Sequence, residues 1–190
     1  MAFTPAAKAD GVYTLPNFNC GGDCPLATYT ATIQSNGGSS YTVTLVIQIA
    51  PNAVIVQNGT DRILSVNVKF ASDLAGVNNG SLTSGPGGVT WTTLEASINN
   101  GGCAGSGGGF VCSQASGTGL PIVAGGTYTW VWNVTLADGA TLTNAIHIGA
   151  NYDPATGRIV SQEVEVPEPS TLVLFGAGLA ALAALRRRLT

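Results

Sequence analysis

The chain has 190 residues, a formal net charge of −3 and a sequence pI near 4.8. Only 9% of the residues are charged, which leaves too few Lys and Arg for the basic face of a nucleic-acid-binding protein, so no nucleic-acid partner is expected. The hydrophobic content of 45% excludes an intrinsically disordered chain, and the 26 glycines follow no collagen period. The length fits one domain of moderate size.

The first nine residues end in Ala7-Lys8-Ala9, which is the small-residue pattern of a signal-peptidase site. The apolar stretch that a signal peptide needs does not precede this pattern. We therefore expect residues 1–9 to be the remnant of a longer signal peptide whose natural start lies upstream. The alternative is an ordinary N-terminal segment without a targeting role.

Residues 10–166 form the predicted body, in which apolar and polar side chains alternate as in strands with one buried face. Segments 27–34 and 41–49 flank a Ser/Asn/Gly turn and predict a hairpin. Further strands are expected near residues 64–70, 89–93, 128–136, 146–152 and 159–166. The glycine-rich stretch 101–109 is expected to be a surface loop. Eight or nine short strands without a helical period predict an all-β body, an antiparallel β-sandwich of the Ig-like or jelly-roll-like kind.

Aromatic residues gather on one face of the strongest strand, where Tyr128, Trp130 and Trp132 share a side. Large aromatic side chains bury the most area, so we expect the tryptophans to fill the core. A sugar-stacking platform is the alternative. Trp91 is less constrained by its neighbours, and we expect it to be half exposed.

The four cysteines form two local pairs in glycine-rich surroundings. We expect disulfides Cys20–Cys24 and Cys103–Cys112, because each loop can close without help from the fold. Zinc binding is the alternative, but the spacings C-x3-C and C-x8-C without a nearby His are unlike zinc knuckles. Free or crossed cysteines remain a third alternative.

Candidate catalytic groups are sparse. The one histidine, His147, lies between two apolar residues that should face inward, so we expect it to face solvent. The body has nine carboxylates, most of them beside turn residues: Asp10, Asp23, Asp61, Asp73, Glu95, Asp138, Asp153, Glu163 and Glu165. A pair of them could serve a glycan hydrolase. No common nucleophile or phosphate-loop motif occurs, so we expect no enzyme activity and no cofactor.

A calcium site is a weaker alternative at Asn151-Tyr152-Asp153 with Thr156. This tract lacks the alternating acidic positions and closing Glu of a calcium-binding loop. We therefore expect no bound metal.

Residues 171–185 form an uncharged apolar stretch, and Arg186, Arg187 and Arg188 follow directly. As a helix this stretch would be about 22 Å long, and snorkelling arginines with local bilayer thinning would let it span a membrane. We expect a transmembrane helix with its arginines on the cytoplasmic side, and a buried C-terminal helix is the alternative. The expected anchor residues are Leu172, Val173, Leu174, Phe175, Leu179, Leu182 and Leu185.

Pro167, Glu168 and Pro169 stand just before this stretch and disfavour a helix there. The order Pro-Glu-Pro, apolar helix, arginine cluster resembles the PEP-CTERM sorting signal of Gram-negative bacteria, over residues 167–190. The resemblance implies an exosortase partner, a membrane-embedded cysteine peptidase or transpeptidase that acts at or near this motif. It also implies release or transfer of the body from the inner membrane to the cell surface or an extracellular matrix.

Together these features predict an exported, membrane-tethered and then exosortase-processed protein of the cell envelope or extracellular matrix. Its β-sandwich body is expected to be structural or adhesive, with exopolysaccharide as a candidate partner. The alternative is an exported glycan-binding module or a glycan hydrolase that uses paired carboxylates. Residues 10–166 contain nine carboxylates and three cations, Arg62, Lys69 and Arg158, so their formal charge is −6. This negative charge disfavours attraction to an anionic polysaccharide.

Overall fold

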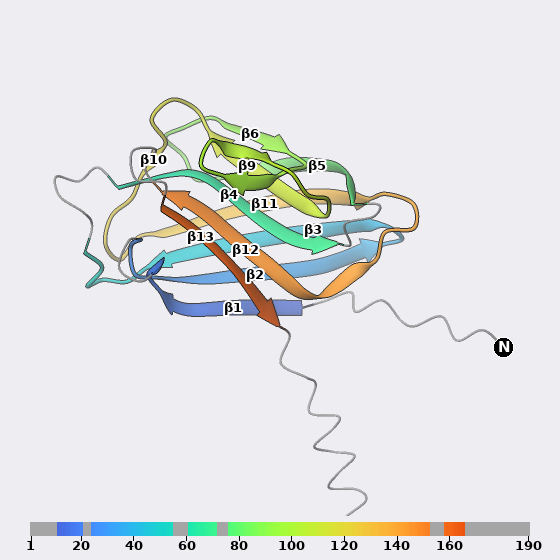
Figure 1. The fold of residues 1–190 in the computed structure, drawn as a ribbon, viewed down its shortest axis with the longest axis horizontal. Helices are drawn as coiled ribbons and strands as arrows, with labels where there is room; N and C mark the ends of the chain where they lie inside the picture. The colour runs from blue at the N-terminus through green and yellow to red at the C-terminus, as the bar shows by residue number, and fades with distance from the viewer. Residues whose placement is uncertain (1–10, 21–23, 55–60, 72–75, 153–157, 166–190) are drawn as a thin grey trace, which may run out of the picture.

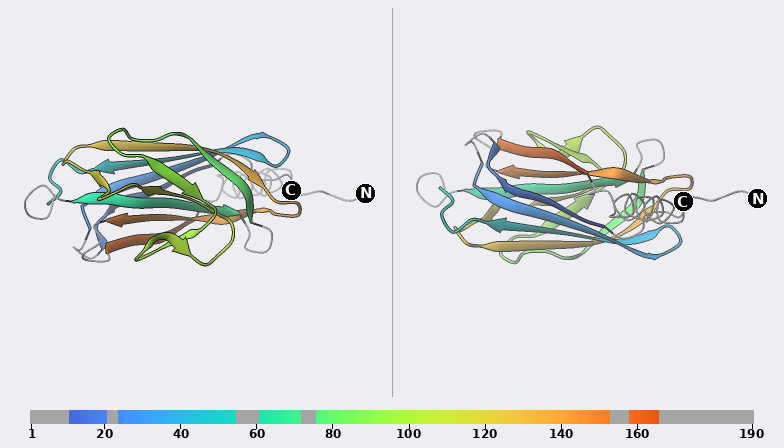
Figure 2. Two further views of the ribbon diagram at one scale, coloured as in Figure 1. Left: turned by 90° about the horizontal axis from the view of Figure 1, so that it is seen from above. Right: turned by 90° about the horizontal axis from the view of Figure 1, so that it is seen from below.

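The computed structural model describes residues 11–20, 24–54, 61–71, 76–152 and 158–165 (Figure 1). Within these ranges the chain forms thirteen strands, which assemble into two main antiparallel sheets and one small hairpin. The two sheets lie face to face as a β-sandwich (Figures 1 and 2). The all-β sandwich expected from the sequence is confirmed.

Sheet A has five strands in the order β1-β2-β3-β11-β5. Its strands are β1 (Gly11–Phe18), β2 (Ala27–Gly37), β3 (Ser40–Ile49), β11 (Thr127–Leu136) and β5 (Val77–Ser84). The hairpin expected from segments 27–34 and 41–49 is present as β2 and β3, with Thr32 opposite Thr44.

Sheet B has six strands in the order β13-β12-β4-β9-β6, with β10 paired to β4. Its strands are β13 (Arg158–Glu165), β12 (Leu142–Tyr152), β4 (Arg62–Ala71), β9 (Phe110–Ala115), β6 (Trp91–Leu94) and β10 (Leu120–Pro121). The remaining hairpin, β7 (Ser97–Asn99) with β8 (Gly102–Gly105), packs against β4, β9 and β12.

The core lies between the two sheets and is built from the inward residues of each strand. Trp130 and Trp132 of β11 are fully buried, so the expectation that they fill the core is confirmed. Trp91 is half-buried and packs edge-on against Trp130, with ring centroids 5.3 Å apart. A fully buried large aromatic side chain removes about 150–250 Å² from water, so Trp130 and Trp132 each contribute strongly to hydrophobic stabilisation.

Two hydrogen bonds join the sheets inside the core. The hydroxyls of Tyr29 (sheet A) and Tyr152 (sheet B) are 2.8 Å apart and both side chains are fully buried. The indole Nε1–H of Trp132 donates to Ser113 Oγ across the same interior, at 2.8 Å. Burial raises the pKa of both tyrosines, so they remain neutral hydroxyl groups over the physiological pH range.

The strand count of eight or nine was too low, because several strands are poor in apolar residues. Strand β5 is Val-Asn-Asn-Gly-Ser-Leu-Thr-Ser and shows little alternation. The expectation that residues 101–109 are a surface loop was wrong in part. Gly102–Gly105 form β8, in which both Gly102 and Cys103 are buried.

Charged residues are divided unequally between the sheets. None of the five strands of sheet A contains Asp, Glu, Lys or Arg. In sheet B, β4 carries Arg62 and Lys69, and β13 carries Arg158, Glu163 and Glu165. Any chemistry that needs a charged strand residue in the described body must therefore use sheet B.

Candidate functional site

A row of polar and aromatic residues crosses the outer face of sheet B. The strand register places Glu163 opposite His147, His147 opposite Lys69, and Lys69 opposite Phe110. These residues share a face because inward and outward side chains alternate along each strand, and their neighbours Ile146 and Ile148 point into the core. The expectation that His147 faces away from the core agrees with this placement.

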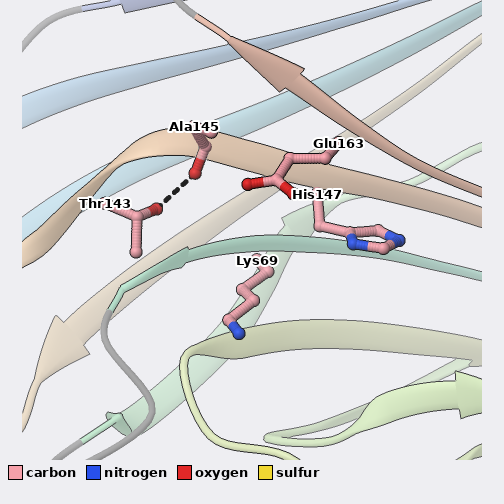
Figure 3. Close-up of a pocket in the computed structure, with 5 residues that line it drawn as sticks. All are labelled: Lys69, Thr143, Ala145, His147 and Glu163. Atoms are coloured by element: carbon pink, nitrogen blue, oxygen red, sulfur yellow. Dashed lines mark hydrogen bonds between the residues drawn. The ribbon is translucent and has the colours of Figure 1, made fainter.

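A pocket of about 320 Å³ lies over this row, between β4, β12 and β13 (Figure 3). Its described lining consists of Lys69, Thr143, Ala145, His147 and Glu163. The Glu163 carboxylate points toward Thr143 and Ala145, whereas the imidazole of His147 turns the opposite way (Figure 3). The two groups are therefore neighbours in register but do not converge on one point.

The electrostatics of the pocket favour a neutral histidine. Partial burial is the largest influence and lowers the pKa of His147; the Lys69 cation lowers it further, and the Glu163 carboxylate opposes both. The imidazole Nε2 shares a hydrogen bond of 2.6 Å with Ser161 Oγ on β13, which fixes the orientation of the ring. His147 is thus an oriented, neutral polar group on the sheet surface.

The cation of Lys69 is held by an aromatic ring. Its Nζ lies 5.3 Å from the ring centroid of Phe110, within the range of a cation–π contact. The Phe110 ring also lies 6.2 Å from the His147 ring, at a tilt of 57°. These contacts give the row one cation, one neutral imidazole and one carboxylate, spread across three strands.

This arrangement can bind a small polar group but does not assemble an acid–base pair. Glycoside hydrolysis uses two carboxyl groups on either side of one bond, and Glu163 is the one carboxyl in the described pocket lining. Within the described ranges, no three His, Cys, Asp or Glu side chains are grouped so as to hold a metal ion. The pocket is therefore a candidate binding surface.

The other carboxylates of the described body are scattered. Glu95 is exposed and accepts a hydrogen bond of 2.9 Å from the backbone N–H of Gly80, and Asp138 is exposed in a turn. Asp61 departs from the expected pattern because it is buried. Asp10, Asp23, Asp73 and Asp153 lie outside the described residues, and so does the side chain of Glu165.

Both local disulfides are present in the structure. Cys20 pairs with Cys24, and Cys103 pairs with Cys112, as the sequence spacing suggests. The second bond joins β8 to β9 and therefore fastens the β7–β8 hairpin, which we call the flap, to the outer face of sheet B.

A buried polar layer lies beneath the flap and was missed by the sequence analysis. Ser65, Asn67 and Asn151 point outward from β4 and β12, yet each is at most 3% exposed. The side-chain amide of Asn151 donates to the carbonyl of Asn99 in the flap, at 3.2 Å. The sequence gives only indirect signs of this layer. Two cysteines enclose the glycine-rich stretch, and β4 has polar residues at outward positions. Of the residues in the calcium alternative, Asn151 faces the flap, whereas Asp153 and Thr156 lie outside the described residues.

The fold and the two disulfides place the body in the class of antiparallel, disulfide-bonded β-sandwiches. The C-terminal residues then identify how it is sorted, because residues 165–188 match the family described as the PEP-CTERM protein-sorting motif. The chain thus carries a PEP-CTERM motif, which implies export, sorting to the membrane or surface, and processing by exosortase.

Comparison with solved structures gives a β-sandwich neighbour. The chain resembles an uncharacterized protein from Nocardia farcinica whose crystal structure reveals an immunoglobulin-like fold, with 18% identity and a TM-score of 0.40. The match covers 70% of this chain and 81% of that one. No curated protein matches the chain.

The expected sorting residues are outside the described part of the structure. These are Pro167, Glu168 and Pro169, the apolar segment 171–185 and Arg186–Arg188. Among the described residues, no helix has the length and hydropathy to cross a membrane. The predicted signal-peptide remnant, residues 1–9, also lies outside the described residues.

Proposed function

We propose that this protein is a non-enzymatic component of the cell envelope or extracellular matrix. In this proposal the C-terminal segment tethers the exported chain to the inner membrane, and exosortase then removes or replaces that tether. The body acts afterwards as a structural or adhesive β-sandwich. The observation that carries the proposal is the sorting motif matched at residues 165–188.

Three features of the body support an extracellular role. Two disulfides suit an oxidising compartment. The formal charge of −6 on residues 10–166 favours solubility outside the cell. The described lining of the pocket offers a single carboxyl group, which fits a binding or scaffold role better than hydrolysis.

Processing can be tested in a bacterium that produces the matching exosortase and in an isogenic strain that lacks it. The chain is expressed behind a signal peptide, and intact mass is measured for the membrane and surface fractions. With exosortase, we expect surface protein without Arg186–Arg188. Without exosortase, we expect the full C-terminus, retained in the inner membrane.

A matched pair of variants locates the signal. Replacement of Pro167, Glu168 and Pro169 by alanine should block processing, whereas Ser170→Ala should leave processing unchanged. Surface protein that still carries its three arginines in exosortase-positive cells would overturn the proposal.

A further inference from the structure

The outer face of sheet A is uncharged and rich in threonine. Its centre is a grid of two rows across β2, β3 and β11, which we call the neutral face. The register aligns the rows strand by strand. The grid consists of Thr30, Val46 and Thr129 in one row and Thr32, Thr44 and Val131 in the next.

The grid has a regular spacing. Neighbouring strands are about 4.8 Å apart, and outward residues along one strand repeat about every 6.7 Å. Each threonine presents one hydroxyl and one methyl group, and the valines present methyl groups at the same positions. On β1, Val12 continues the second row opposite Thr32, and this apolar side chain is 61% exposed. The face thus mixes hydrogen-bonding and apolar groups at short intervals.

The grid is also stiff. Threonine and valine are branched at Cβ and have few χ1 rotamers in strands, so little side-chain entropy is lost when a partner orders them. A face of Lys and Glu would lose more side-chain entropy on binding, because these side chains have more rotatable bonds. Among the described elements, the extra β7–β8 hairpin packs on sheet B, and Thr129 on sheet A is exposed.

The charge distribution selects the chemistry of the partner. The strands of sheet A contain no ionisable Asp, Glu, Lys or Arg, so a charged polymer finds no counter-charge there. The body as a whole is formally negative, which repels a polyanion at long range. An uncharged polysaccharide suits both conditions, because its hydroxyls can bond to the threonines and its C–H groups can cover the methyl groups.

We infer that the neutral face is the contact surface for an uncharged polysaccharide. This inference rests on the proposed function, since it names the partner of the adhesive body. Many weak, regularly spaced contacts bind a repeating polymer along its length, in contrast to a deep pocket that binds one sugar.

The test compares two soluble polymers with the same backbone, hydroxyethyl cellulose (uncharged) and carboxymethyl cellulose (anionic). Full-length protein in detergent is run in native gels that contain a graded concentration of each polymer. We expect hydroxyethyl cellulose to retard the protein and carboxymethyl cellulose to have a much smaller effect.

Variants then assign the surface. Thr129→Glu should weaken binding to hydroxyethyl cellulose by about tenfold or more, because contact would bury an unpaired carboxylate. Thr129→Ser keeps the hydroxyl and should change binding by less than about threefold. The matched control is Thr92→Glu on β6 of sheet B, another exposed strand threonine, which should bind as the parent does.

Several results would overturn the inference while leaving exosortase processing intact. These are no retardation by hydroxyethyl cellulose, stronger retardation by carboxymethyl cellulose, or equal losses in Thr129→Glu and Thr92→Glu. A dimer in sedimentation analysis that Thr129→Glu dissociates would assign the face to a second copy instead. Thermal unfolding of each variant checks that a loss of binding does not reflect a loss of folding.

Discussion

The two sheets share one inward pattern but differ on their outer faces. Sheet A presents Thr, Asn, Gln and Val without a charged residue, and sheet B carries the charged strand residues, the pocket, the flap and its disulfide. The inward residues of both sheets must be apolar to form the core. The outward residues are not constrained by the core, so the two outer faces can differ in composition. Sheet A suits extended contact with a neutral surface, and sheet B suits local polar chemistry.

The largest expected effect tests whether the sheets depend on one shared core. Trp132→Ala removes a fully buried side chain of sheet A together with its hydrogen bond to Ser113 of sheet B. We expect a loss of about 3–5 kcal/mol in the free energy of unfolding, measured by denaturant titration. Trp132→Phe is the control and should lose clearly less, since it keeps most of the buried area. A loss below about 1 kcal/mol for Trp132→Ala would contradict the shared core.

The flap disulfide gives the next effect and is specific to sheet B. Replacing Cys103 and Cys112 together by alanine should lower the free energy of unfolding by about 2–3 kcal/mol, because the unfolded chain gains loop entropy. The same change at Cys20 and Cys24 closes a shorter loop and should cost less. Hydrogen exchange should show faster exchange in the flap of the first variant, with sheet A unchanged. Equal protection of the flap in both variants would count against its being fastened by this bond.

The tyrosine pair tests the polar link between the sheets. Tyr29→Phe or Tyr152→Phe leaves one buried hydroxyl without its partner, so each should cost about 1–2 kcal/mol. The double variant should cost less than the sum of the two, because no orphaned hydroxyl remains. A double-mutant cycle measures this coupling, and strict additivity would show that the contact contributes nothing.

The smallest effect is a pH dependence that sheet B alone should show. Burial lowers the pKa of folded His147 below its unfolded value, so protonation favours the unfolded chain. Stability should therefore be highest above the ordinary histidine pKa and should fall slightly as the pH drops from about 7.5 to 5.5. The effect is small because the half-exposed ring stays partly solvated. His147→Gln should flatten this part of the stability curve; an unchanged slope would assign the dependence to other groups.

Much of the fold could be predicted because alternation is strong where one strand face is buried. The Tyr128–Trp130–Trp132 face is the clearest case, and all of the alternate positions from Trp130 to Leu136 are buried. Alternation of apolar and polar residues does not predict burial where both faces of a strand are covered. Ser65 and Asn67 are polar residues at outward positions, and they are buried because a distant segment, the flap, lies over them.

The candidate pocket could not be predicted from the sequence. Lys69, His147 and Glu163 come from three strands, and only the register of those strands brings them into one row. Local patterns give the direction of each side chain but not its cross-strand partner. The sorting motif is the opposite case: its parts are contiguous, so the sequence alone indicates it, and the family match at residues 165–188 supports it.

The last strand has a consequence for the order of events at the membrane. Strand β13 ends at Glu165, and Pro167 stands two positions later with only Val166 between them, a distance of at most about 7 Å along the chain. A peptidase that cuts at the Pro-Glu-Pro motif must therefore either act next to the folded β-sandwich or cut before the sandwich has folded. A spacer inserted between Glu165 and Pro167 would distinguish these two orders of events. It should speed cleavage only if the body folds before the peptidase acts.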